Sequence, residues 1–220
     1  MGIVGLANVG KSSTFNLLSK LNVPAENYPF CTIDPNTANA LIPDERFDHL
    51  CKVFNPRSQL KPTLQIIDIA GLVPGASEGL GLGNSFLSHI QAVDGIFHVV
   101  RAFEDPRIAH TEGRVDPVKD MEIICEELMK KDQQLLEKKL AMAARKGHDK
   151  TAKLEHEVLT KVKEMFTKKK WVKDHDWNEQ EVMILNTHLF LTAKPVIYLI
   201  NVSAKEFIVK LSLFFLVLIL

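Results

Sequence analysis

A glycine-rich stretch near the N-terminus has the residue types and spacing of a phosphate-binding loop. Residues 5–12 read Gly-Leu-Ala-Asn-Val-Gly-Lys-Ser and satisfy the pattern G-x-x-x-x-G-K-[ST] completely. The glycines let backbone N–H groups curl toward phosphate oxygens, the lysine places an ammonium near the β- and γ-phosphates, and the serine hydroxyl ligates Mg²⁺. A helix that begins at the serine adds its positive N-terminal end. The pattern predicts that a triphosphate is bound by Asn8, Val9, Gly10, Lys11, Ser12 and Ser13.

A second element is Asp68-Ile69-Ala70-Gly71, which ends a strand-like stretch at Thr63–Ile67. Open α/β sheets bind ligands at the carboxyl ends of their strands, which is where this element lies. Asp68 is predicted to hold Mg²⁺ through water, and the N–H of Gly71 to contact the γ-phosphate. Without the phosphate-binding loop, the element would look like an ordinary turn at a strand end.

A third candidate is Thr32, in the loop sequence Tyr-Pro-Phe-Cys-Thr-Ile-Asp-Pro-Asn at 28–36. A threonine between the helix after the phosphate-binding loop and the Asp68 strand is placed to reach Mg²⁺ and the γ-phosphate. A turn or capping threonine is the alternative interpretation.

The elements that must position these residues follow from hydrophobic patterning. Long connections separate the strand-like stretches, and such spacing indicates βαβ units and a mainly parallel sheet. We therefore expect an α/β fold with strands at Gly2–Val4, Thr63–Ile69, Gly95–Arg101 and Val196–Asn201, and a helix at Ser12–Lys20.

Between these strands lies a lysine- and glutamate-rich region with apolar residues at helical spacing. Asp120–Lys146 and Thr151–Lys170 are predicted to be helices joined by a turn at Gly147–Lys150, forming an antiparallel hairpin. Lys119–Lys173 contains 15 basic and 10 acidic residues. Two interpretations of this surplus stay open, a solvated helix face and an arm that contacts phosphates through Lys168–Lys170.

Composition limits the remaining function classes. The 220 residues carry no net charge, so no global field selects DNA or a membrane surface. The three cysteines are widely spaced, without a metal-binding pattern, and no secretory leader is recognisable at the N-terminus. We expect a cytoplasmic monomer.

The apolar stretch 208–220 is shorter than the ~20 residues of a bilayer span and is expected to be an atypical tail.

Several stretches together resemble the Obg-like ATPase family, also called YchF, within the P-loop NTPases. They are GLANVGKSS (5–13), ENYPFCTIDPN (26–36), DIAGLVPGASEGLGLGNSFLSHI (68–90) and RAFEDPRIAHTEGRVDP (101–117), together with PDERFDHL (43–50) and the stretch from 175 to 203. The resemblance implies a Ras-like sheet domain interrupted by a coiled-coil arm, Mg²⁺-dependent ATP hydrolysis in the cytosol, and a ribosome-linked role. It ends near Phe207, whereas the family continues into a TGS domain, so we expect a shortened form.

The resemblance also implies a division of the chain. Residues 1–118 and 190–207 would form the nucleotide-binding domain, 119–173 the helical hairpin, 174–189 a helical connection, and 208–220 the tail.

The residue that orients the attacking water is not evident from the motifs. Leu72 occupies the position of the Ras-like glutamine and cannot hydrogen-bond to water. The resemblance implies His110 in this role, since an imidazole can orient or deprotonate water; the sequence alone does not prefer it to His89 or His98. Asn8 would also help to hold K⁺ beside the phosphates, as in related loops.

The base-reading position is unusual. The chain lacks NKxD, and the matching stretch is Asn201-Val202-Ser203-Ala204. Ala204 has no acceptor to select guanine, whereas Asn201 can still hydrogen-bond to a purine. The family has glutamate where Ala204 stands, so ATP preference and weak discrimination that admits GTP both stay open. Other departures from the family are Ala7, Ser13 and Pro74.

Three functional hypotheses result. The first is an ATP-hydrolysing regulatory switch linked to the ribosome or its RNA. The second is a GTPase of the same family. The third is a non-catalytic binding module whose arm docks on a partner.

Overall fold

The structure is a computed structural model that describes residues 1–20, 36–69, 89–144, 150–205 and 207–208. A five-stranded sheet contains β1 (Gly2–Val4), β2 (Asn36–Leu41), β3 (Thr63–Asp68), β4 (Ile96–Arg101) and β5 (Val196–Asn201) in the order β2-β3-β1-β4-β5. All neighbouring strands are parallel except β2, which runs antiparallel to β3. The expected mainly parallel α/β sheet is confirmed, and four of its strands differ from the predicted ranges by at most one residue.

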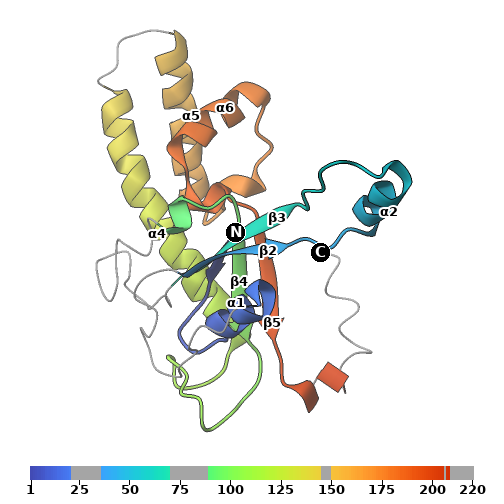
Figure 1. Ribbon diagram of the computed structural model, residues 1–220. Helices are drawn as coiled ribbons and strands as arrows, with labels where there is room; N and C mark the ends of the chain where they lie inside the picture. Colours follow the sequence, from blue (N-terminus) through green and yellow to red (C-terminus); the bar gives the residue numbers. More distant parts are fainter. Residues whose placement is uncertain (21–35, 70–88, 145–149, 206, 209–220) are drawn as a thin grey trace.

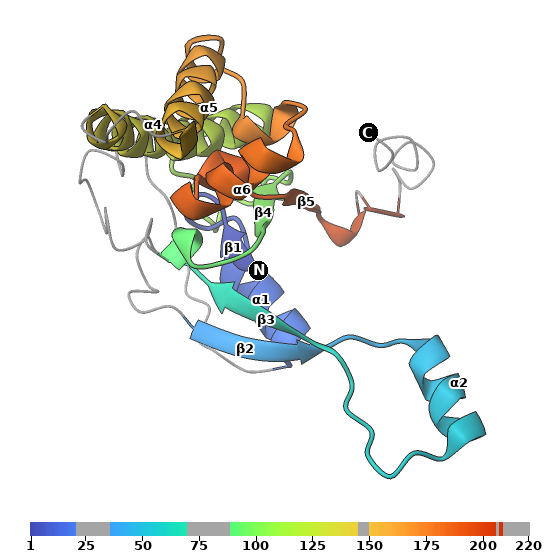
Figure 2. The same ribbon diagram turned by 90° about the horizontal axis from the view of Figure 1, so that it is seen from above.

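Helices lie on both faces of the sheet (Figures 1 and 2). On one face, α1 (Lys11–Ser19) buries Phe15 in the core and lines a hollow with Phe97 and Val99 of β4. On the other face, His98 of β4 packs beside Tyr198, which lies against Cys125 of α4 (Pro117–Ala143). Adjacent strand residues point to opposite faces, so α1 and α4 cover opposite sides of β4.

The expected helical hairpin is present as α4 and α5 (Lys150–Thr167), which lie side by side and extend beyond the sheet face that the first part of α4 covers (Figure 1). α4 begins three residues before the predicted start because Asp116 caps it and Pro117 occupies the first turn. α5 ends at Thr167, and Lys169 adopts a left-handed conformation (φ 53°) just beyond it. The helices share an apolar cluster with α6 (Glu179–His188) that includes Leu136, Val158, Val162, Phe166, Leu185 and Phe190.

Two short 3₁₀ turns complete the return to the sheet, η2 (Val172–Asp174) and η3 (Leu191–Ala193). Asp132 of α4 accepts hydrogen bonds from the backbone N–H groups of Leu191 and Thr192, at 2.9 and 2.7 Å, and from the Thr192 hydroxyl at 2.7 Å. These contacts join the hairpin to the segment that enters β5.

The segment from β2 to β3 was not predicted in detail. It contains α2 (Glu45–Phe54), which is capped by Asp44 and contains no buried residue. Figure 2 shows α2 at the far end of the β2–β3 pair, away from the rest of the molecule. Its apolar residues Leu50, Val53 and Phe54 are exposed. Periodicity indicates such a helix poorly when its apolar face has no partner in the described chain.

At the opposite edge of the described sheet, β5 exposes Ile197 and Ile200. None of the described helices is long and apolar enough to cross a bilayer. The tail at 209–220 lies outside the described residues.

Candidate nucleotide-binding site

The carboxyl ends of four strands meet at one edge of the sheet and position the candidate site residues. In the register of the sheet, Ile3 pairs with Asp68 and with Phe97, and Asn201 pairs with Arg101. The phosphate-binding loop therefore leaves β1 directly beside Asp68 on one side and the end of β4 on the other. This is the edge at which parallel sheets place their ligands.

The loop between β1 and α1 has a curled backbone. Asn8 (φ 59°) and Gly10 (φ 103°) both adopt positive φ, and Gly10 directly precedes α1. At Gly5 a Cβ would lie 2.4 Å from the carbonyl oxygen of Val99, so only glycine lets the loop pass this close to β4. Left-handed residues within a short loop turn successive N–H groups toward one side, which makes an anion-binding concavity.

Lys11 begins α1, and its side chain turns back across this loop. Its side chain is buried, and its ammonium donates a hydrogen bond of 2.6 Å to the carbonyl oxygen of Leu6 across the loop. The lysine charge opposes the rise that burial causes in the pKa of Asp68, so the ammonium lies within electrostatic reach of that carboxylate. A cation beside a curled loop that precedes a helix N-terminus is suited to polyphosphate.

Asp68 is fully buried at the end of β3. Neither carboxylate oxygen has a hydrogen-bond partner of good geometry in the described part of the chain. Burial raises the pKa of Asp68, and the nearby Ser12 hydroxyl and Lys11 ammonium oppose that shift. A buried carboxylate with so little compensation is costly, and a bound cation is one way to compensate it.

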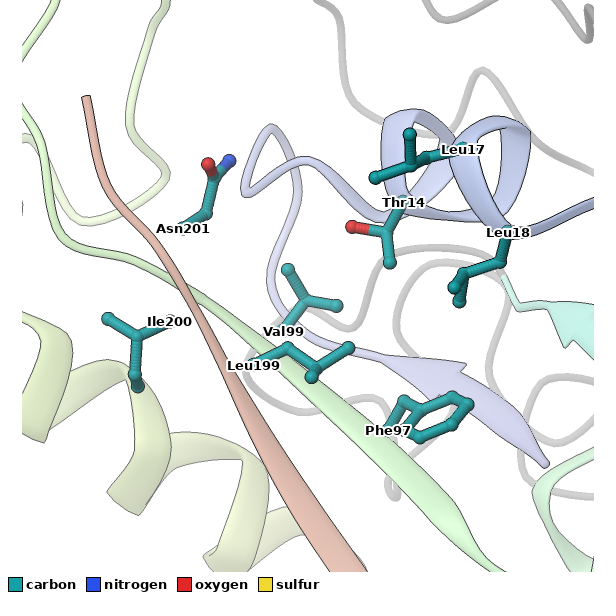
Figure 3. A pocket seen from close by; sticks show the side chains of 8 residues that line it. All are labelled: Thr14, Leu17, Leu18, Phe97, Val99, Leu199, Ile200 and Asn201. Atoms are coloured by element: carbon teal, nitrogen blue, oxygen red, sulfur yellow. The ribbon is translucent and has the colours of Figure 1, made fainter. Parts of the chain in front are cut away.

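Asn201 connects the last strand to the loop. Its side-chain N–H donates a 3.0 Å hydrogen bond to the carbonyl oxygen of Val9. The same nitrogen would lie 2.5 Å from a Cβ at Gly10, so the loop and the amide fit closely. In Figure 3 the amide of Asn201 points from the end of β5 toward this loop.

Comparison with known proteins agrees with this geometry. A family model described as "50S ribosome-binding GTPase" matches residues 1–146. The chain is 54% identical over 210 residues to Obg-like ATPase 1 of Oryza sativa subsp. indica, and 55% identical over 215 residues to Obg-like ATPase 1 of Gallus gallus. These alignments cover 94% and 96% of this chain but 53% and 54% of the relatives. The chain belongs to the Obg-like ATPase family.

A solved structure of the Schizosaccharomyces pombe YchF GTPase supports the same assignment. It matches with a TM-score of 0.75 and 46% sequence identity over 95% of this chain and 58% of that one. The predicted family and Ras-like P-loop fold are thereby confirmed. The chain spans about half the length of the Obg-like ATPase relatives that it matches.

The donor set at the sheet edge fits the Mg²⁺ that this family implies. A buried carboxylate at Asp68 and a hydroxyl at Ser12 lie beside each other, and oxygen ligands of this kind suit magnesium. Mg²⁺ usually keeps several waters and takes one or two protein ligands plus phosphate oxygens. Thr32, the other predicted ligand, and Gly71 lie outside the described residues.

The ring of His110 contacts groups outside this donor set. Its Nε2 lies 2.9 Å from Oδ2 of Asp120, and its Nδ1 accepts a hydrogen bond of 3.2 Å from the backbone N–H of Glu112. The neighbouring Ala109 does reach the phosphate-binding loop, because its carbonyl oxygen accepts a 3.1 Å hydrogen bond from the Asn8 side chain. The structure thus brings the His110 loop to the site while both ring nitrogens contact other groups.

Arg101 is a residue that sequence analysis missed. It ends β4 with only 1% of its surface exposed, and its guanidinium donates to the carbonyl oxygens of Phe103 and Ile108, at 2.9 and 3.1 Å. A charged residue at the end of the apolar stretch Gly95–Arg101 was the available signal. Sequence spacing could not indicate that it organises the loop leading to His110. Asp120 was also missed, because an acid in the first turn of a helix is common.

The remaining predicted residues have less distinctive surroundings. Ser13 is exposed on the first turn of α1, and Val202 is half-buried just after β5. Ala204 is exposed.

A hollow of about 290 Å³ lies between α1 and the strands β4 and β5 (Figure 3). Its lining is mostly apolar: Thr14, Leu17, Leu18, Phe97, Val99, Leu199, Ile200 and Asn201. Neither Lys11 nor Asp68 lines it, so its chemistry does not suit phosphates. The phosphate-binding loop rather than this hollow is the candidate site.

Proposed function

We propose that this protein binds ATP with Mg²⁺ on the loop from Gly5 to Ser12 and hydrolyses it to ADP and phosphate, acting as a nucleotide-dependent regulatory switch in the cytoplasm. The observation that carries the proposal is the buried carboxylate of Asp68, which only the nearby Ser12 hydroxyl and Lys11 ammonium partly compensate, beside a curled glycine loop. A buried carboxylate of this kind is costly, and a bound cation that also contacts the phosphates would lower that cost.

Each side chain would have a separate task. Lys11 would bind the β- and γ-phosphates, exchanging its contact with the Leu6 carbonyl oxygen for phosphate oxygens. Asn8, Val9, Gly10 and Ser13 would surround the phosphates, Ser12, Asp68 and Thr32 would hold the metal, and Asn8 would also border a K⁺ site. Bound Mg²⁺ would supply positive charge that offsets the negative charge of the β- and γ-phosphates.

Hydrolysis would require His110 to orient the attacking water and the N–H of Gly71 to contact the γ-phosphate. Leucine at position 72 leaves the first task to another group. The contact between Asn8 and the carbonyl oxygen of Ala109 supports this role, because it brings the loop that carries His110 to the phosphate site.

The base would be read at the end of β5. Asn201 donates one N–H to the Val9 carbonyl oxygen and would hydrogen-bond to the purine with its remaining polar atoms. Val202 would pack beside the purine. The absence of an acceptor at Ala204 removes the means of selecting guanine. We therefore expect the site to bind ATP more tightly than GTP. Relatives carry both descriptions, Obg-like ATPase and YchF GTPase.

The arm formed by α4 and α5 would contact the ribosome or its RNA. Lys168, Lys169 and Lys170 are exposed together at its base. Binding to ribosomes should weaken steeply with salt, and glutamine at all three positions should reduce the salt slope. Glutamine at Lys52, Arg57 and Lys61 removes as many exposed positive charges near α2 and is the control. Equal effects of the two triple variants would contradict the assignment.

The deciding experiment measures affinity and turnover of Mg·ATP and Mg·GTP for the 220-residue chain and for its Lys11→Ala variant. We expect ATP to bind more tightly than GTP and to be hydrolysed, with both properties lost in the variant. Turnover of GTP much faster than ATP would favour the GTPase alternative.

One observation favours the binding-module alternative. With both nitrogens of His110 in contact with Asp120 and Glu112, the ring offers no nitrogen to a water. Binding of Mg·ATP without hydrolysis, unchanged by His110→Ala, would support that alternative.

A further inference from the structure

The surroundings of His110 determine where its ring proton lies. Nδ1 accepts the backbone N–H of Glu112, so a neutral ring carries its proton on Nε2 and donates it to Oδ2 of Asp120. The side chains of His110 and Asp120 are only 4% and 2% exposed. In this arrangement the imidazole can neither accept a proton from water nor hydrogen-bond to it.

Asp120 depends on this contact more than a structural carboxylate does. Its other oxygen, Oδ1, has no hydrogen-bond partner among the described residues. Burial raises the pKa of Asp120, and the hydrogen bond from His110 is the main opposing influence. Asp132, the other buried aspartate of α4, instead accepts three hydrogen bonds from the segment that leads into β5. Asp132 therefore has a structural partner set, whereas Asp120 has the His110 ring.

The backbone that carries His110 is held by other groups. Arg101 donates to the carbonyl oxygens of Phe103 and Ile108, and Asn8 donates to that of Ala109. The loop up to Ala109 is thus attached to β4 and to the phosphate-binding loop independently of Asp120. What Asp120 determines is the direction of the imidazole.

We propose that Asp120 is a positioning residue that holds the His110 imidazole against the first turn of α4 in an inactive orientation. The ring must leave Asp120 before it can act on water. The inference rests on the proposed function, in which His110 orients the attacking water. The His110 ring thus has two orientations, one bound to Asp120 and one released from it, and Asp120 biases the equilibrium toward the bound, inactive orientation. Nucleotide binding shifts that balance by acting on Asn8 and the neighbouring loop.

The kinetic test compares Asp120→Ala, Asp120→Asn and the wild-type chain. Alanine removes the acceptor, and asparagine keeps a weaker, neutral one. We expect kcat for ATP to rise about threefold to tenfold in Asp120→Ala and less in Asp120→Asn, with KM within about twofold of wild type. Glu122→Ala removes an exposed acid from the same stretch of α4 and should leave kcat unchanged.

A double-variant cycle separates a positioning role from a merely structural one. In a His110→Ala background, Asp120→Ala should have no effect on kcat, because the ring through which it acts is gone. A rise in kcat that persists without His110 would overturn the proposal. A fall in kcat in Asp120→Ala, with the fold intact by circular dichroism, would overturn it as well.

A spectroscopic test does not depend on turnover. In the ¹⁵N-histidine NMR spectrum of the wild-type chain, the Nε2–H of His110 should give a protected signal that His110→Ala and Asp120→Ala abolish and Glu122→Ala retains. A non-hydrolysable ATP analogue with Mg²⁺ should weaken that signal, which supports release; an unchanged signal would overturn the proposal. If neither the wild-type chain nor any variant hydrolyses ATP, the proposed function fails. The Nε2–H signal still decides whether Asp120 holds the His110 ring.

Discussion

Two loops at the same edge of the sheet differ in how they are built. The phosphate-binding loop after β1 is shaped by its own residues, through positive φ at Asn8 and Gly10 and close approach at Gly5. The loop after β4 is shaped by residues outside it, since Arg101 and Asn8 hold its backbone and Asp120 holds the ring of His110. Phosphate binding is therefore specified locally in this protein, whereas the position of the histidine is a tertiary property. Four changes would sharpen or break this contrast.

The largest effect is expected for Lys11→Ala. The variant loses the one ammonium inside the loop, and charge-assisted hydrogen bonds to phosphate are among the strongest available, so the Kd for Mg·ATP should rise by at least roughly 100-fold. Isothermal titration calorimetry measures the change. Lys20→Ala, at an exposed position just after α1, is the control and should bind normally. Affinity retained in Lys11→Ala would refute the site.

Gly10→Ala should be the next most damaging change. The new Cβ would meet the Asn201 nitrogen at 2.5 Å on a backbone with φ of 103°, so we expect a loss of about 1–3 kcal/mol in stability together with weakened ATP binding. The double variant Gly10→Ala/Asn201→Ala removes the clash and should recover part of the stability in thermal melts. No recovery at all would show that backbone strain alone accounts for the loss.

Arg101→Lys tests the second loop. Lysine cannot reproduce the fork that binds the carbonyl oxygens of Phe103 and Ile108, so the free energy of unfolding should fall by about 2 kcal/mol. Because the phosphate-binding loop is built separately, the Kd for Mg·ATP should stay within about threefold of wild type, while kcat falls. Denaturant titration and steady-state kinetics measure the two. An equal loss in Kd would mean that the loops are not independent.

The smallest effect concerns the stability of the chain in EDTA. Burial raises the pKa of Asp68 above its unfolded value, so the native state binds more protons and loses stability as pH rises through the native pKa. Asp68→Asn removes the cost of burying an ionised carboxylate. It should stabilise the protein at pH 7 by about 1 kcal/mol, or roughly 2–4 °C in Tm, and by less at pH 4. Adding Mg²⁺ with ATP should raise the Tm of the wild type and not that of the variant. A lower Tm for Asp68→Asn in EDTA would show that the carboxylate is already compensated.

Prediction from the sequence succeeded where spacing along the chain corresponds to spacing in the fold. The strands, α1 and the two arm helices were identifiable from local periodicity, and the loop at 5–12 from its glycines and its Lys-Ser pair. The same patterning missed β2, whose inward residues Ala38 and Ala40 are small, and α2, none of whose residues is buried within the described chain. Thr32 and Gly71 stay predictions, because they lie outside the described residues.

By itself, the sequence determined the nucleotide-binding loop, because a curled backbone next to a lysine depends on which residues are adjacent along the chain. It also determined the parallel sheet that brings Asp68 beside that loop. Only the tertiary structure decided that Arg101 and Asn8 hold the His110 loop, and that Asp120 faces the imidazole. Those contacts join the ends of different strands and a helix, and their distances depend on how the sheet and α4 pack rather than on any local pattern.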